Sequence, residues 1–162
     1  MTIVSDTTPI ISLIKINHLD LLKKLFGEVI IPGAVFNELT ASKTFCEEAD
    51  TVRNAGFLKT FAVQNIQSVK ILQTLSGLDD GESEAIVLAG EHESNLLIID
   101  ERKGRKVAQK LGIAITGTVG ILLQAHYESL ISSDEVRKSL EILRNSNVRL
   151  SDSLIKEALS LL

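Results

Sequence analysis

The chain has few of the residues that build disulfides and thiolate sites. Its 162 residues include one cysteine, Cys46, and three histidines. One cysteine excludes an intramolecular disulfide and a thiolate zinc site, and His18, His92 and His126 show no metal-ligand spacing. No motif surrounds Cys46, so we expect it to be a small, at least partly buried apolar residue. The natural compartment is a reducing cytoplasm.

Long hydrophobic runs are also absent. No apolar stretch approaches the roughly 20 residues of a bilayer span, and the first residues lack the features of a signal peptide. There is no Pro-, Gly- or Ser-rich linker and no internal repeat. We expect no membrane partner and a single domain over residues 1–162, with residues 133–162 as a C-terminal helical extension.

The net charge of −4 is unevenly distributed. Residues 1–100 carry 7 basic and 14 acidic side chains, whereas residues 101–162 carry 10 and 7. A negative chain is weakly disfavoured as a nucleic-acid binder. It can still bind a polyanion if its acids hold divalent cations and its basic residues gather beside them.

Short aliphatic or β-branched runs alternate with helix-length segments. The expected strands are residues 3–5, 29–31, 57–63, 96–99 and 113–115. Strands separated by helices favour parallel pairing with right-handed crossovers, so the pattern predicts a three-layer α/β/α sandwich.

Helix-start signals agree with this fold class. Thr8 predicts an N-cap with Pro9 at the first helical position, and Pro32 opens the next helix in the same way. Asp79 to Glu82 predicts a capped helix before the fourth strand. The tail predicts helices at 134–145 and 151–162 around a short strand at 148–150.

Acidic residues provide the main functional signal. Asp6 and Asp100 each follow an expected strand, and ligands of open parallel sheets bind outside the carboxyl ends of the strands. Glu38 and Glu82 lie in expected helices next to apolar residues. The alternatives are helix N-caps for the two aspartates and solvated glutamates at a helix rim, with Glu82 also favoured by the helix dipole.

Familiar catalytic motifs are missing. There is no GxxxxGK[ST] loop, no GxGxxG after a strand, no HExxH and no GxSxG. A phosphatase that uses its first-strand aspartate would have a second one where Thr8 stands. A receiver domain would have an acidic pair after its first strand and a lysine after its fifth, where Thr116 stands.

Five stretches resemble, in order and spacing, the PIN domain family of metal-dependent ribonucleases, especially its toxin-like, VapBC-type branch. They are Val4–Ile11, Ile31–Leu39, Leu78–Ile86, Ile98–Ala108 and Thr116–Gly120. The resemblance extends over residues 3 to about 125. It implies a parallel sheet of order 3-2-1-4-5, in which the first and fourth strands are neighbours.

The resemblance also implies a site. The family's metal-binding, catalytic acids fall on Asp6, Glu38, Glu82 and Asp100. Many members carry a further aspartate shortly after the one on the fourth strand, whereas here Glu101 follows directly. Thr116 and Thr118 offer hydroxyls near the fifth strand, and Thr7 is a candidate for orienting a carboxylate or water.

Hydrolysis of a phosphodiester needs a hydroxide and a counter-charge for the phosphate, and Mg²⁺ or Mn²⁺ supplies both. Such hard cations prefer carboxylate oxygens. Converging carboxylates repel one another, so without metal at least one should have a raised pKa; Glu38 or Glu82 is expected to be affected more than a strand-end aspartate.

A basic run begins two residues after Asp100. It consists of Arg102, Lys103, Arg105, Lys106 and Lys110. The alternative is a solvated helix face. Its position favours phosphate contact, and we assign Arg102 and Arg105 to the substrate backbone or to organising the site.

The resulting expectation is a cytoplasmic, metal-dependent endoribonuclease. The resemblance implies products with 3′-hydroxyl and 5′-phosphate ends, a homodimer, and a role as the toxin of a toxin-antitoxin pair with a small antitoxin protein as partner. The alternative is a catalytically silent PIN-fold module that binds RNA or protein.

Overall fold

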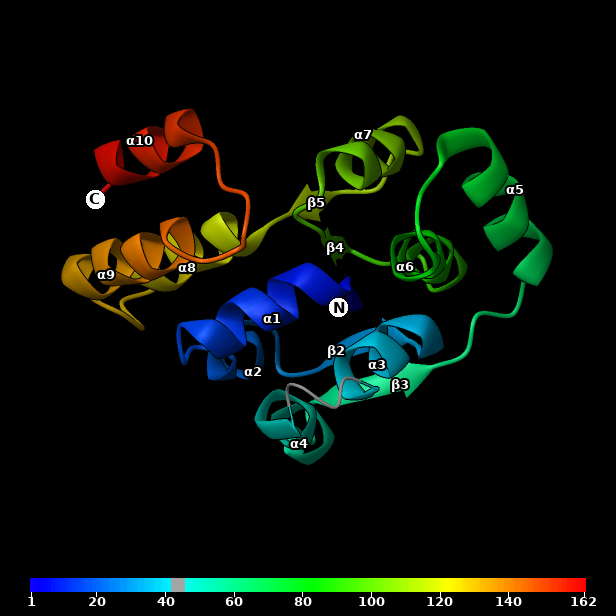
Figure 1. The fold of residues 1–162 in the computed structure, drawn as a ribbon, viewed down its shortest axis with the longest axis horizontal. Coiled ribbons are helices and arrows are strands. Elements are labelled where there is room, and N and C mark those ends of the chain that lie inside the picture. Colours follow the sequence, from blue (N-terminus) through cyan, green and yellow to red (C-terminus); the bar gives the residue numbers. More distant parts are fainter. Residues whose placement is uncertain (42–45) are drawn as a thin grey trace.

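The fold is built on a parallel sheet of five strands (Figure 1). The computed structural model describes residues 1–41 and 46–162. The strands are β1 (Ile3–Ser5), β2 (Val29–Pro32), β3 (Leu58–Phe61), β4 (Leu96–Ile98) and β5 (Ile115–Thr116). Their order, β3-β2-β1-β4-β5, confirms the predicted α/β class and strand order.

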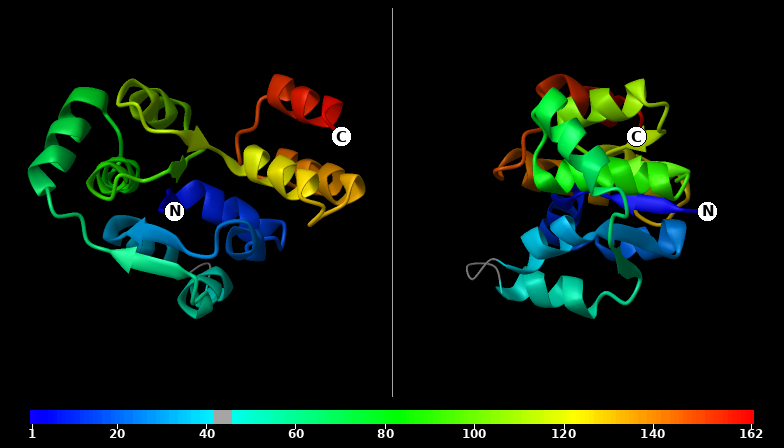
Figure 2. Two further views of the ribbon diagram at one scale, coloured as in Figure 1. Left: turned by 180° about the vertical axis from the view of Figure 1, so that it is seen from behind. Right: turned by 90° about the vertical axis from the view of Figure 1, so that its right-hand side faces the viewer.

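Helices connect the strands and cover the sheet (Figures 1 and 2). They are α1 (Thr7–Lys15), α2 (Asp20–Phe26), α3 (Gly33–Thr40), α4 (Cys46–Asn54), α5 (Ile66–Ser76), α6 (Asp80–Glu91), α7 (Arg102–Lys110), α8 (Thr118–Tyr127), α9 (Ser133–Arg144) and α10 (Asp152–Ser160). Within residues 1–41 and 46–162, no helix has both the length and the apolar character needed to cross a bilayer.

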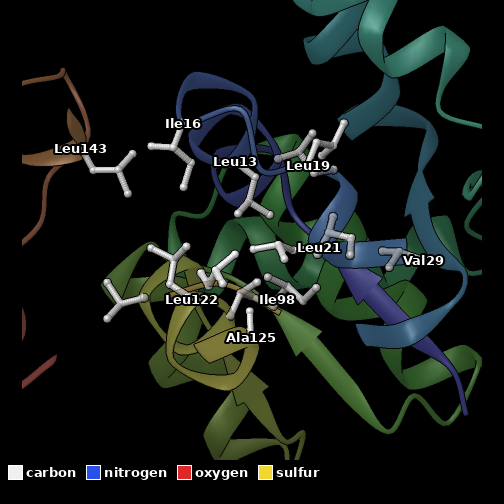
Figure 3. Packing of buried hydrophobic residues seen from close by; sticks show 14 of the residues in the cluster. Leu13, Ile16, Leu19, Leu21, Val29, Ile98, Leu122, Ala125 and Leu143 are labelled. Carbon is white, nitrogen blue, oxygen red and sulfur yellow. The ribbon is translucent and has the colours of Figure 1, made fainter. Parts of the chain in front are cut away.

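The sheet has a hydrophobic cluster on each face because successive side chains of a strand point in opposite directions. Ile3 and Ile98 contribute to the cluster formed with α1, α2, α8 and α9, part of which is shown in Figure 3. Val4 and Leu97 contribute to the other cluster, with α6 and α7. Both faces of the central strands are therefore buried, which explains their continuous apolar sequences.

The first helix begins two residues earlier than predicted. Its N-cap is Asp6 rather than Thr8, so Pro9 is the third helical residue. The Asp6 backbone N–H donates a 2.9 Å hydrogen bond to the Ile98 carbonyl, which extends the strand pairing up to the start of the helix. Pro32 is both the last residue of β2 and the N-cap of α3.

Two other expectations are wrong. Residues 148–150 form no strand and lie in the connection between α9 and α10. Cys46 is exposed, because it is the first residue of α4 and not part of a buried stripe. The predicted cap at Asp79 is confirmed: it forms a reciprocal capping box with Glu82.

Candidate active site

The pairing of β1 with β4 brings two distant aspartates to the same edge of the sheet. Ser5 lies opposite Ile98 in the parallel register. Asp6 directly follows Ser5, and Asp100 is the second residue after Ile98, so both lie beyond the carboxyl ends of adjacent strands. At this point the strand order reverses, which is where open α/β sheets bind ligands.

Asp6 has a buried carboxyl group whose hydrogen-bonding capacity is only partly used by the described residues. It is 2% exposed, and within the described part of the chain its Oδ1 atom has no hydrogen-bond partner. Burial raises the pKa of Asp6 to about 7, against a lowering by the Thr7 backbone N–H. The charges of Glu82, Asp79 and Glu38 raise this pKa further, in that order of effect.

Glu38 is held against α6 by small, specific contacts. Its Oε2 atom accepts a 2.9 Å hydrogen bond from the Thr7 hydroxyl, and the Gly81 backbone also donates to its carboxylate. The Glu38 carboxylate packs directly against Gly81, and a Cβ atom at that position would collide with it. Burial of the carboxylate raises the pKa of Glu38, and the negative charge of the nearby Asp79 raises it further.

Glu82 is both a helix-capping residue and a neighbour of these acids. Its backbone N–H donates to Asp79 Oδ1 at 2.8 Å, and its Oε2 atom accepts from the Asp79 N–H at 3.2 Å. Burial raises the pKa of Glu82, and the charges of Asp79, Glu101 and Glu38 raise it further. Glu82 therefore caps α6 and at the same time interacts electrostatically with the other candidate acids.

Asp100 has a different environment. Its Oδ1 atom accepts a 2.7 Å hydrogen bond from the Thr118 backbone, and its Oδ2 atom accepts a 2.6 Å bond from the Thr118 hydroxyl. Burial raises the pKa of Asp100, while Thr118 and the charge of Arg105 lower it. Arg105 is itself anchored, since its Nη1 atom donates to the Ile99 carbonyl at 2.8 Å.

The predicted acids thus form two parts of one edge. Asp6, Glu38 and Glu82 are close enough for the charges of both glutamates to raise the pKa of Asp6. Asp100 follows the adjacent strand, and its pKa responds to Thr118 and Arg105 rather than to the other three acids. The prediction of a raised pKa is confirmed, but the expectation that a glutamate would be affected more than an aspartate is wrong for Asp6. That aspartate is far more deeply buried than either glutamate.

The remaining predicted residues differ in their surroundings. Arg102 is the first residue of α7 and is exposed; it has no hydrogen bond or ion pair with any described residue. Thr116 is half-buried in β5 and packs closely against Gly120. Thr7 and Thr118 both hold carboxylates of the site, as described above.

Two neighbouring acids were not predicted as site residues. Asp79 raises the pKa of Asp6, Glu38 and Glu82, although its sequence position indicated only a helix cap. Glu101 raises the pKa of Glu82 and caps α7 through the Lys103 and Gly104 N–H groups. The density of acids between residues 79 and 84 was the available signal for Asp79.

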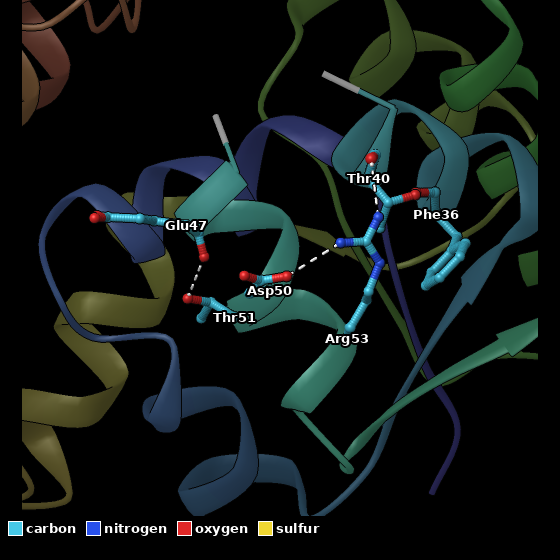
Figure 4. Close-up of polar contacts among 6 residues, drawn as sticks. All are labelled: Phe36, Thr40, Glu47, Asp50, Thr51 and Arg53. Carbon is cyan, nitrogen blue, oxygen red and sulfur yellow. Dashed lines mark hydrogen bonds and ion pairs between the residues drawn. The ribbon is translucent and has the colours of Figure 1, made fainter. Parts of the chain in front are cut away.

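The helix that carries Glu38 is anchored at its far end by α4 (Figure 4). Arg53 donates from Nη2 to the carbonyl of Thr40, the last residue of α3, at 3.2 Å. Its Nη1 atom lies 3.2 Å from Asp50 Oδ1. The Thr40 hydroxyl in turn donates to the Phe36 carbonyl at 2.7 Å.

The chemistry of these side chains fits a hard divalent cation. Carboxylate oxygens are its preferred protein ligands, and the buried Asp6 Oδ1 atom lacks a partner among the described residues. Across residues 1–41 and 46–162, however, no three His, Cys, Asp or Glu side chains are already grouped around one metal position. The chemistry of the carboxylates fits such a cation, but the described side chains are not grouped around a single metal position.

A parallel sheet of this order, with acids beyond the ends of β1 and β4, is a nuclease-type fold. The chain belongs to the PIN domain family: the family model DUF3368, described as a PIN domain, matches residues 2–162. PIN domains are generally nucleases and typically use divalent metals. The comparison with curated proteins gave no match.

Proposed function

We propose that the protein is a metal-dependent endoribonuclease, with Asp6, Glu38, Glu82 and Asp100 as the ligands of Mg²⁺ or Mn²⁺. The observation that carries this proposal is the buried Asp6 carboxyl group, whose Oδ1 atom has no partner among the described residues and whose pKa is raised by burial and, to a smaller extent, by the charges of Glu82 and Glu38. Charges that repel one another in this way are stabilised by a bound cation. Such a cation would supply a hydroxide nucleophile and neutralise charge on the phosphate.

The residues around the acids support this role by fixing the carboxylates. Thr7 and Gly81 orient Glu38, and Thr118 orients Asp100 from two donors. Residues that orient metal ligands in this way are an essential part of metal sites. Arg102 is exposed at the start of α7, where its guanidinium can bind a substrate phosphate.

The proposal extends to partners and location. We infer a cytoplasmic toxin that forms a homodimer and is inhibited by a small antitoxin protein. Exposed apolar side chains support a protein partner: Ile71, Leu75 and Leu111 line a cavity of about 630 Å³ bounded by α5, α6 and the end of α7.

The alternative function is a PIN-fold module that binds RNA or protein without cleaving it. One observation favours it: Asp100 is already satisfied by Thr118 and faces the positive charge of Arg105. A catalytic site would have to share this carboxylate with the metal.

Cleavage and metal binding by single variants separate the two functions. In Mn²⁺ buffer, Asp6→Asn and Asp100→Asn should each lower cleavage of single-stranded RNA more than about 100-fold, since changes to residues that merely orient ligands cost about 10- to 100-fold. Glu141→Gln removes an exposed acid of α9 and should leave cleavage unchanged.

Anomalous scattering from a crystal soaked in Mn²⁺ should show density among the four acids. Wild-type protein that binds RNA but cleaves none of it, with no Mn²⁺ density at this edge, would establish the binding module instead.

A further inference from the structure

The last helix and Arg149 border the candidate active site. A cavity of about 510 Å³ lies between α10 and the end of the sheet. Asp100 and Arg105, which follow β4, line it on one side, and Leu154 of α10 and the C-cap residue Leu161 line it on the other. In Figure 1 the connection between α9 and α10 passes the beginning of α8, and this path places Arg149 in the cavity wall.

A second cavity adjoins the first. It has a volume of about 340 Å³, and Thr8 and Lys15 of α1 contribute to its lining. Asp100 and Arg149 line both cavities. The two cavities therefore share two lining residues, the proposed metal ligand Asp100 and Arg149.

Arg149 has no competing partner among the residues that the structure describes. Arg149 is exposed and makes no hydrogen bond or ion pair with any residue in the described ranges. Arg105 contributes a second guanidinium to the first cavity, and Lys15 contributes an ammonium group to the second. Guanidinium groups bind phosphate through paired N–H donors, so this junction suits a phosphodiester.

The cavity next to α10 combines polar and apolar walls. Val119 and Leu123 of α8 face it together with Leu154. Its volume lies within the range of about 300–1,000 Å³ typical of small-ligand sites. Glu157 adds a carboxylate, a group that can accept hydrogen bonds from the amino groups of bases. An unstacked nucleobase matches this combination of apolar surface and acceptors.

We propose that the cavity between α10 and β5 binds one nucleoside of a single-stranded RNA substrate, and that Arg149 and Arg105 hold the phosphate of that nucleoside next to Asp100. This inference rests on the proposed function and assigns its substrate-binding subsite. It makes the C-terminal extension part of the RNA-binding surface. A duplex would not enter, because its bases are stacked and paired.

The test measures RNA binding separately from cleavage. Fluorescence anisotropy of a short labelled single-stranded RNA is recorded with the full chain in EDTA, and cleavage is followed in Mn²⁺. Arg149→Gln should weaken binding about tenfold and lower the salt-dependence slope by about one. It should raise KM with little change in kcat, because the arginine contributes to binding rather than to the chemical step.

Two further variants make the test specific. Lys156→Gln removes a positive charge from α10 at an exposed residue that does not line the cavity, and it should bind RNA like the wild type. Leu154→Asp places a negative charge in the partly exposed apolar wall and should weaken binding as much as Arg149→Gln.

The outcomes distinguish this inference from the proposed function. Wild-type binding and cleavage by both Arg149→Gln and Leu154→Asp would overturn the subsite and leave the ribonuclease intact. Binding that depends on Arg149 without any cleavage would support the subsite and reject catalysis. If the wild-type chain does not bind RNA, the proposed subsite is rejected, because a nucleoside of RNA is the ligand proposed for it.

Discussion

At the scale of single residues, the site depends on close approach between small groups and carboxylates. The Glu38 carboxylate packs against Gly81 of α6, where there is no side chain. The hydroxyl of Thr7, in α1, donates a hydrogen bond to the same carboxylate. Glu38 is thereby oriented although it is an exposed residue. Its position is fixed at the carboxylate, which is the part that the proposed chemistry uses.

Gly81→Ala tests this packing. The new methyl group would displace the Glu38 carboxylate, so we expect RNA cleavage and Mn²⁺ affinity to fall about 10- to 100-fold. Stability should change little, because the displaced group is the end of a flexible side chain. Kinetics and Mn²⁺ titration measure the effect.

Gly90→Ala is the matched control on the same helix. Nothing lies within 4 Å of a Cβ atom at Gly90, so this variant should retain full activity and gain up to about 1 kcal/mol in helix stability. Equal cleavage by both alanine variants would show that the Glu38 position does not matter.

At the scale of helices and strands, the sequence predicted the sheet better than the helix starts. Every strand of the sheet lies within one or two residues of its expected position. For β1, β2 and β4 the reason is that buried parallel strands are short, continuous apolar runs. The start of α1 was missed because the hydrogen bond from Asp6 to Ile98 exists only after β1 and β4 pair. Such tertiary contacts leave no local signal in the sequence.

The same distinction applies to the site residues. Asp6 and Asp100 could be predicted because each follows an apolar run. The pairing of β1 with β4 then brings both aspartates to the same edge of the sheet. The environment of Asp100 could not be predicted, since Thr118 and Arg105 reach it through the fold. Arg149 gave no signal at all, because its place beside Asp100 depends on how the α9–α10 connection runs.

Helix α10 makes a limited contribution to the core. Ile155 and Ala158 are its buried residues, whereas Leu159 and the C-cap residue Leu161 are 41% and 65% exposed. We expect deletion of residues 151–162 to uncover apolar surface on the adjoining elements and to lower solubility or weaken self-association. Sedimentation velocity measures this; an unchanged sedimentation coefficient per protomer together with unchanged solubility would contradict it.

At the scale of the whole molecule, the buried acids should make folding stability depend on pH. The pKa of Asp6 is about 7 in the folded chain against an ordinary value of 3.8, so the native state binds more protons than the unfolded state between these values. Stability should therefore fall as pH rises from 4 to 7, by about 4 kcal/mol from Asp6. The raised pKa values of Glu38, Glu82 and Asp100 act in the same direction.

Urea unfolding across this pH range in metal-free buffer measures the effect. Asp6→Asn should remove most of the decline and be more stable than the wild type at pH 8. Mn²⁺ should raise the wild-type midpoint at pH 8 much more than at pH 5, because it binds the ionised acids and stabilises the native state by mass action. A flat wild-type profile would mean that Asp6 titrates normally.

The strand order also determines when the acidic centre can form during translation. β1 is made first but pairs with β4, and Asp100 is held by Thr118, which comes later still. A nascent chain that ends before these residues leave the ribosome has no assembled centre. The proposed ribonuclease activity would therefore be withheld until most of the domain has been synthesised, and the growing chain could not cut the messenger that encodes it.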